Sequence, residues 1–123
     1  MIQATFLVAT GGAIGAASRF LLGVGILRLF GQGFPVAVMI ANVAGSFLMG
    51  LAVVYFGRTG SPLAPFVLTG LLGGFTTFSA FSLEAYTLFE RGLLGQAAGY
   101  VGLSVILSIA ALIAGVTLAR GVL

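Results

Sequence analysis

Residues 70–82 read Gly-Leu-Leu-Gly-Gly-Phe-Thr-Thr-Phe-Ser-Ala-Phe-Ser and lie in the middle of a long apolar run. Paired glycines weaken a helix, and hydroxyls that follow can bond to the backbone groups that a break releases. Irregular backbone at membrane depth usually lines a cavity or binds an ion. The stretch therefore predicts a discontinuous helix beside such a site. A tight helix crossing, with each hydroxyl bonded to its own helix, is the alternative.

The rest of the chain divides into similar apolar runs. Three interruptions are predicted to be loops: Gly31-Gln32-Gly33 before Pro35, residues 57–62, and Glu90-Arg91-Gly92. They separate segments 3–29, 34–56, 63–89 and 94–119. Each exceeds the roughly 20 residues that a spanning helix needs. The sequence predicts an all-α membrane protein, with residues 1–123 forming one domain of four transmembrane helices.

Composition supports a membrane protein and excludes several functions. Hydrophobic residues make up 60% of the 123 residues and charged residues only 6%, against about 25% charged in soluble domains. The charged residues are scattered, which argues against nucleic-acid binding. Cysteine, histidine and aspartate are absent, so no catalytic triad or zinc cluster is predicted. The first apolar run has no basic residues before it and is interpreted as a span, not a cleaved signal peptide.

The positions of the arginines hardly favour either orientation of the chain in the membrane. Four spans place Arg58 and Arg120 on one side of the membrane, and Arg28 and Arg91 on the other, joined by Arg19 if it reaches the interface. Orientation follows an excess of basic residues on the cytoplasmic side. The near balance predicts insertion in both directions and an antiparallel homodimer about an axis in the membrane plane. A weak preference for one orientation is the alternative.

Twenty glycines are about double the usual share. Small residues four apart let helices approach closely in lipid. The sets with this spacing are Gly11 with Gly15, Gly12 with Ala16, Ala37 with Ala41 and Gly45, and Gly95 with Gly99. They predict a compact bundle and do not indicate a cargo.

Four polar residues within the apolar runs are candidate pore residues. Asn42 is a lone amide in the second run, and it must face either a partner helix or a pore, because an unpaired amide in hydrocarbon is costly. Tyr100, Ser104 and Ser108 recur every fourth residue and place three hydroxyls on one helical face about 12 Å long. Such a stripe can replace water around a small anion. Serines bonded to their own helix are the alternative.

Aromatic and charged residues complete the candidate set. Phe78 and Phe81 share a face, and the positive edges of their rings can stabilise an anion weakly, although phenylalanine pairs usually serve packing. Arg19 lies inside the first run and either draws anions into a vestibule or extends to the headgroups. Glu84 lies about one turn beyond the phenylalanines, where it can cap or pair near an interface.

Three motifs resemble the Fluc (CrcB-type) fluoride channels. They are Gly-Gly-Ala-Ile-Gly-Ala-Ala-Ser-Arg-Phe at 11–20, Asn-Val-Ala-Gly-Ser-Phe-Leu-Met-Gly at 42–50, and Gly-Gly-Phe-Thr-Thr-Phe-Ser-Ala-Phe-Ser-Leu-Glu at 73–84. The resemblance runs from the first span through the fourth. It implies a dual-topology homodimer in the cell membrane, with two antiparallel pores and a structural sodium ion at its centre.

The resemblance also implies residue roles. The pore residues would be Asn42, Phe78, Phe81, Tyr100, Ser104 and Ser108, together with Thr77, Ser79 and Ser82 beside the phenylalanines. Arg19 matches a vestibule arginine, and the backbone carbonyls of Gly73 and Thr76 match the sodium ligands. Ala80 stands where the family often has threonine, so one hydroxyl beside the pore is missing.

The implied function is passive export of fluoride, which lowers its cytoplasmic concentration and confers fluoride resistance. Two other functions compete. A small dual-topology multidrug exporter needs a membrane-embedded acid in its first span, which contains no acidic residue and carries Arg19 instead. A non-conducting scaffold subunit needs only the glycine packing, and it leaves Asn42, the hydroxyl stripe and the phenylalanines unexplained.

Overall fold

The computed structural model describes residues 1–31 and 35–123. Its elements are α1 (Ile2–Phe30), α2 (Val36–Thr59), the π-helical segment η1 (Pro65–Leu72), α3 (Gly73–Phe75), α4 (Phe78–Glu90) and α5 (Leu94–Val122). Four helical spans are long and apolar enough to cross a membrane: α1, α2, α5 and the combined stretch Pro65–Glu90. The prediction of an all-α protein with four membrane-length helices is confirmed.

Glycines with left-handed backbone torsions mark the helix ends. Gly60, with φ 65° and ψ 24°, ends α2 by donating its N–H to the Phe56 carbonyl at 3.0 Å. The helix therefore continues through Gly57 and Arg58, and the prediction of a loop beginning at Gly57 is wrong. Gly92, with φ 76°, follows α4 as expected. In the first predicted loop, Gln32 and Gly33 lie outside the described residues.

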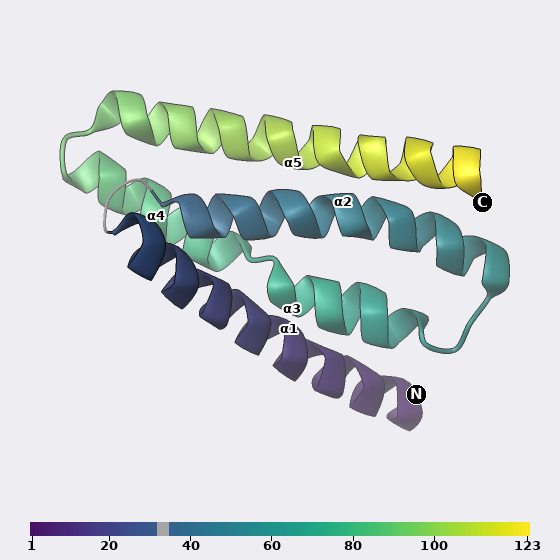
Figure 1. Ribbon diagram of the computed structural model, residues 1–123. Helices are drawn as coiled ribbons and strands as arrows, with labels where there is room; N and C mark the ends of the chain where they lie inside the picture. The colour runs from purple at the N-terminus through teal and green to yellow at the C-terminus, as the bar shows by residue number, and fades with distance from the viewer. Residues whose placement is uncertain (32–34) are drawn as a thin grey trace.

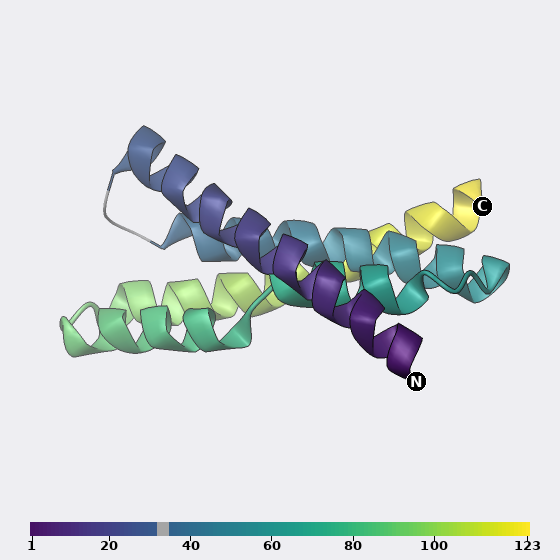
Figure 2. The same cartoon turned by 90° about the horizontal axis from the view of Figure 1, so that it is seen from below.

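The spans form an irregular bundle with α2 at its centre. In Figure 1, α2 lies between α5 and the η1–α3 stretch, and α1 packs on the outer side of that stretch. Figure 2 shows α1 crossing the others obliquely, so that its C-terminal half diverges from α4. Both chain ends lie at the same end of the bundle in both views, together with the connection from α2 to η1.

Glycines at two crossings bring backbones into direct contact. A Cβ added to Gly11 or Gly15 would collide with backbone atoms of η1, and one added to Gly50 would collide with the Leu112 carbonyl of α5. The predicted close approach at Gly11 and Gly15 is confirmed. Gly95 and Gly99, in contrast, have no atom within 4 Å of an added Cβ. The prediction that this pair packs closely against another helix is therefore wrong for the single chain.

Gly15→Ala is expected to destabilise the protein by about 1–3 kcal/mol, because overpacking a tight contact forces backbones apart. The new methyl would collide with the Leu71 carbonyl and lie 2.8 Å from the Phe75 nitrogen. Thermal unfolding in detergent measures the effect. Gly25→Ala is the matched control, since nothing lies within 4 Å there and alanine favours a helix. Equal unfolding temperatures for the two variants would contradict the role of Gly15.

Candidate functional site

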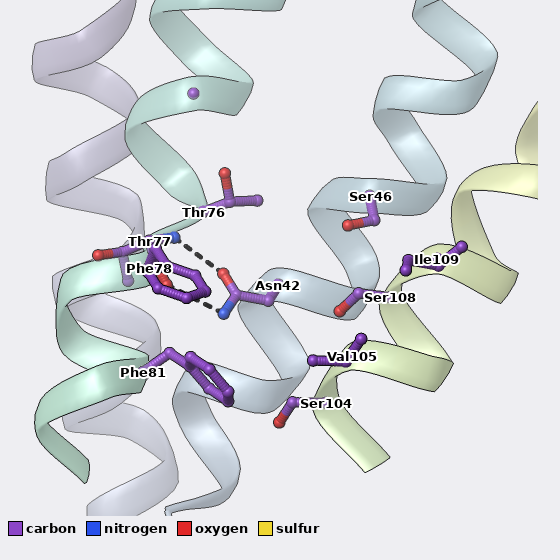
Figure 3. A pocket seen from close by; sticks show the side chains of 11 residues that line it. Asn42, Ser46, Thr76, Thr77, Phe78, Phe81, Ser104, Val105, Ser108 and Ile109 are labelled. Carbon is purple, nitrogen blue, oxygen red and sulfur yellow. Dashed lines mark hydrogen bonds between the residues drawn. The ribbon is translucent and has the colours of Figure 1, made fainter. Parts of the chain in front are cut away.

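A cavity of about 430 Å³ opens beside the junction of α3 and α4 (Figure 3). Its lining comes from α2, α5 and the third span. The lining residues are Asn42, Ser46, Gly73, Thr76, Thr77, Phe78, Phe81, Ser104, Val105, Ser108 and Ile109. In Figure 3 the two phenylalanines lie on one side of the cavity and the α5 serines on the opposite side. The cavity thus gathers residues that are far apart in the chain.

The helical hydrogen-bond pattern changes at two threonines beside this cavity. Thr76 (φ −88°, ψ 156°) and Thr77 (φ −154°, ψ 131°) have extended torsions between α3 and α4. Asn42 binds the backbone here through two hydrogen bonds: its Nδ2 donates to the Thr77 carbonyl at 3.1 Å, and its Oδ1 accepts the Thr77 N–H at 2.8 Å. A carboxamide has two N–H donors, so one remains for the cavity. Asn42 therefore acts as a link between helices and also lines the cavity.

Two carbonyls next to the cavity lack the amide that a continuous helix would supply. The Thr77 N–H donates to Asn42 instead of the Gly73 carbonyl, and the Ala80 N–H donates to Thr77 Oγ1 at 3.3 Å instead of the Thr76 carbonyl. Unwound carbonyls at membrane depth are typical cation ligands. The Gly73 and Thr76 carbonyl oxygens are therefore left without a helical amide donor.

The serines of α5 are not bonded to their own helix. Ser104 is 4% exposed, and its Oγ has no hydrogen-bond partner among the described residues. Elsewhere in the chain, Thr5, Thr10 and Thr87 each donate to the carbonyl four residues earlier, at 2.8–3.0 Å. A buried hydroxyl without a partner is costly. Ser104 is therefore suited to a ligand that enters the cavity.

Three aromatic rings contact one another in a row that begins at the cavity. The ring centroids of Phe78 and Phe81 are 5.3 Å apart, and those of Phe81 and Tyr100 are 5.2 Å apart. Phe81 is 8% exposed, whereas Phe78 is 76% exposed in the single chain. The stack fixes Phe81 and leaves Phe78 accessible at the cavity rim.

The chemistry of the lining suits a small anion. It offers the Asn42 N–H, serine hydroxyls and phenylalanine ring edges, and no acidic side chain is among the described lining residues. The N-terminus of α4 also begins at the cavity, where the helix dipole favours negative charge. No cluster of three or more histidine, cysteine or acidic residues occurs in the described parts of the chain.

Known proteins are similar to this sequence over nearly its full length. The family described as "CrcB-like protein, Camphor Resistance (CrcB)" matches residues 6–116. The chain belongs to the CrcB-like family. The fluoride-specific ion channel FluC of Cereibacter sphaeroides is 60% identical over 121 residues, 98% of each chain. Proteins of that name from Ruegeria sp. and Agrobacterium fabrum are 64% and 51% identical. The first alignment covers 94% of both chains, and the second covers 93% of this chain and 94% of the relative.

Three charged residues of this CrcB-like protein line a second cavity of about 410 Å³, bounded by α1, α2 and α4. Arg19, Glu84 and Arg91 are among its lining residues. Arg19 Nε also donates to the Gly74 carbonyl at 3.4 Å. This carbonyl lies near the C-terminal end of α3, where the partial negative charge of the helix dipole favours a cation. Arg19 thus lines this second cavity and contacts the third span.

Three predicted pore residues lie outside the lining of the Asn42 cavity. Tyr100 is fully buried behind Phe81, and its hydroxyl donates to Glu84 Oε2 at 3.4 Å. Ser79 is exposed and hydrogen-bonds Thr77 Oγ1 at 3.1 Å, and Ser82 is also exposed. In the single chain, the structure therefore groups Ser104 and Ser108 with Asn42 and separates them from these three.

Three lining residues of the CrcB-like chain were not predicted: Ser46, Val105 and Ile109. Ser46 carries a recognisable signal, because it follows Asn42 by one helical turn and so shares its face. Val105 and Ile109 follow Ser104 and Ser108 directly. Their apolar side chains look like ordinary lipid-facing residues in the sequence.

Proposed function

We propose that this protein is a passive, fluoride-selective channel that exports fluoride from the cytoplasm. The observation that carries the proposal is the unpartnered, buried Ser104 hydroxyl in a cavity that also holds Asn42 and the phenylalanine edges. Fluoride must exchange its water for such donors, and weak, repeated binding lets an ion leave again. The relatives named as fluoride-specific channels support the same conclusion.

Electrostatics sets the direction of transport. An inside-negative potential drives an anion outward by about 2.3 kcal/mol per charge per 100 mV. Fluoride enters cells as neutral hydrofluoric acid and ionises in the cytoplasm, so a passive channel lowers the internal concentration. The competing multidrug-exporter function lacks support because α1 contains no acidic residue.

Fluoride efflux from liposomes tests the proposal directly. Purified protein is reconstituted with internal fluoride, valinomycin is added to release the potential, and an electrode records efflux beside a parallel chloride experiment. Rapid efflux of fluoride without chloride is expected. Folded protein that releases no fluoride would favour the scaffold function instead.

The functional unit in this proposal is an antiparallel homodimer with two pores. Large apolar side chains are exposed throughout the single chain, including Phe78 and Phe20, and lipid or a second copy must cover them. The arginines are divided almost evenly between the two ends, which favours insertion both ways. A cysteine at Thr59, which is exposed at the end of α2, should be labelled from both sides of the membrane; labelling from one side alone would contradict dual topology.

A sodium ion at the dimer centre fits the Gly73 and Thr76 carbonyls, because both lack their helical amide. Hard cations prefer several oxygen ligands, so two carbonyls from each copy would share the ion. The ion would supply positive charge that holds the two copies together. Exchanging sodium for N-methylglucamine at constant ionic strength is expected to lower the dimer fraction measured by light scattering. An unchanged fraction would argue against the sodium site.

A further inference from the structure

About one turn beyond the lining of the Asn42 cavity, α2 and α5 are in direct backbone contact, and we call this end of the cavity its closed end. A Cβ on Gly50 would collide with the Leu112 carbonyl and lie 2.9 Å from the Val116 nitrogen, and one on Gly115 would lie 3.1 Å from the Leu51 nitrogen. Backbones in such contact leave no room for an ion between them. An ion that moves along the α5 serines must therefore turn before this crossing.

The α5 hydroxyls stop short of the closed end. One turn after Ser108 the residue is Leu112, which is apolar. On α2, Ser46 lies one turn after Asn42 and one turn before Gly50. Figure 3 shows Ser104, Ser108 and Ser46 in that order along the cavity, with Ser46 farthest from Phe81. Ser46 thus continues the row of hydroxyls from α5 onto α2.

At this end of the cavity, the hydroxyl of Thr76 already donates a hydrogen bond. Thr76 Oγ1 donates to the Leu72 carbonyl at 2.9 Å. A Cβ on Gly45 would collide with the Thr76 methyl, so Gly45 allows Thr76 to lie against α2 directly beside Ser46. Ser46 itself makes no hydrogen bond to any described residue. The Ser46 hydroxyl therefore remains available to donate to an ion, whereas the Thr76 hydroxyl does not.

We propose that Ser46 is a fluoride-binding residue at the closed end of the cavity, where the ion leaves the α5 serines and turns toward the open face. This inference rests on the proposed channel function. The Ser46 hydroxyl donates to the ion after Ser108 has released it. It replaces a water molecule around the ion, which the apolar side chain of Leu112 cannot do. Ser46 is therefore expected to influence apparent affinity for fluoride as well as rate.

Ser46→Ala is expected to reduce fluoride efflux about tenfold or more, the lower end of the range for a hydrogen bond to a charged group, and to raise the half-saturating fluoride concentration. Ser46→Thr keeps the hydroxyl and should retain more than half of the wild-type efflux. Ser18→Ala is the matched control, since Ser18 is a serine of α1 that is exposed and outside the cavity lining. Its efflux should equal that of the wild type.

Size-exclusion profiles first establish that all four proteins assemble alike. Wild-type efflux and affinity in Ser46→Ala, or an equal loss in Ser46→Thr and Ser46→Ala, would overturn the role of the hydroxyl while the channel function stands. Absence of efflux from the wild-type protein would overturn the proposed function, and this inference with it.

Discussion

Asn42→Ala is expected to lower fluoride efflux about 100-fold or more. The amide donates one N–H to the Thr77 carbonyl and retains a second for the ion. In water-excluded enzyme sites, removing one preorganised donor to a developing anion reduces rates by about 10²–10³, and a dehydrated fluoride ion depends on its donors in the same way. Stability should also fall by about 1–3 kcal/mol, because the part-buried Thr77 N–H loses its acceptor.

Two measurements separate the two effects of this substitution. Efflux is compared with that of Ile40→Ala, a change on the same helix at a side chain that is 39% exposed, and thermal unfolding is recorded for both. The control should conduct like the wild type. Full efflux from Asn42→Ala, combined with reduced stability, would leave Asn42 with only the interhelical role.

Local sequence patterns were sufficient to predict the spans, because the length and apolarity of each span can be read from its own residues. Length and apolarity identified four membrane-crossing helices, and the spacing of Gly11 and Gly15 identified a backbone crossing. The same patterns misplaced the end of α2. Gly57 resembled a loop residue, but Gly60 supplied the left-handed torsion that ends α2.

The candidate site was less predictable, because a cavity combines faces of different helices. The stripe at Tyr100, Ser104 and Ser108 shares one face of α5, yet only the two serines line the cavity, since Phe81 packs over Tyr100. The two hydrogen bonds between Asn42 and Thr77 join residues 35 positions apart. No periodicity along the chain encodes such a pairing.

Phe81→Ile is expected to reduce fluoride efflux about tenfold, which corresponds to the upper end of the energy of an aromatic contact, with only a modest loss of stability. Isoleucine retains much of the apolar volume at this 8% exposed position, whereas it removes the aromatic ring, with its positive edge, from the cavity lining. The Tyr100 ring, at 5.2 Å, also loses its stacking neighbour. Efflux from liposomes, with the dimer fraction measured in parallel, tests both parts of this expectation.

Phe89→Ile provides the matched control for this variant. Phe89 lies on the same helix, is 58% exposed, and is outside the cavity lining, so the chemical change is identical while the ion pathway is untouched. Conduction should remain at the wild-type level. If both variants conduct normally, the phenylalanine at position 81 serves packing alone. If both lose conduction equally, α4 itself is sensitive to the exchange. A loss confined to Phe81→Ile would attribute the effect to the ring edge inside the cavity, because only there does the aromatic group lie beside Asn42 and Ser104.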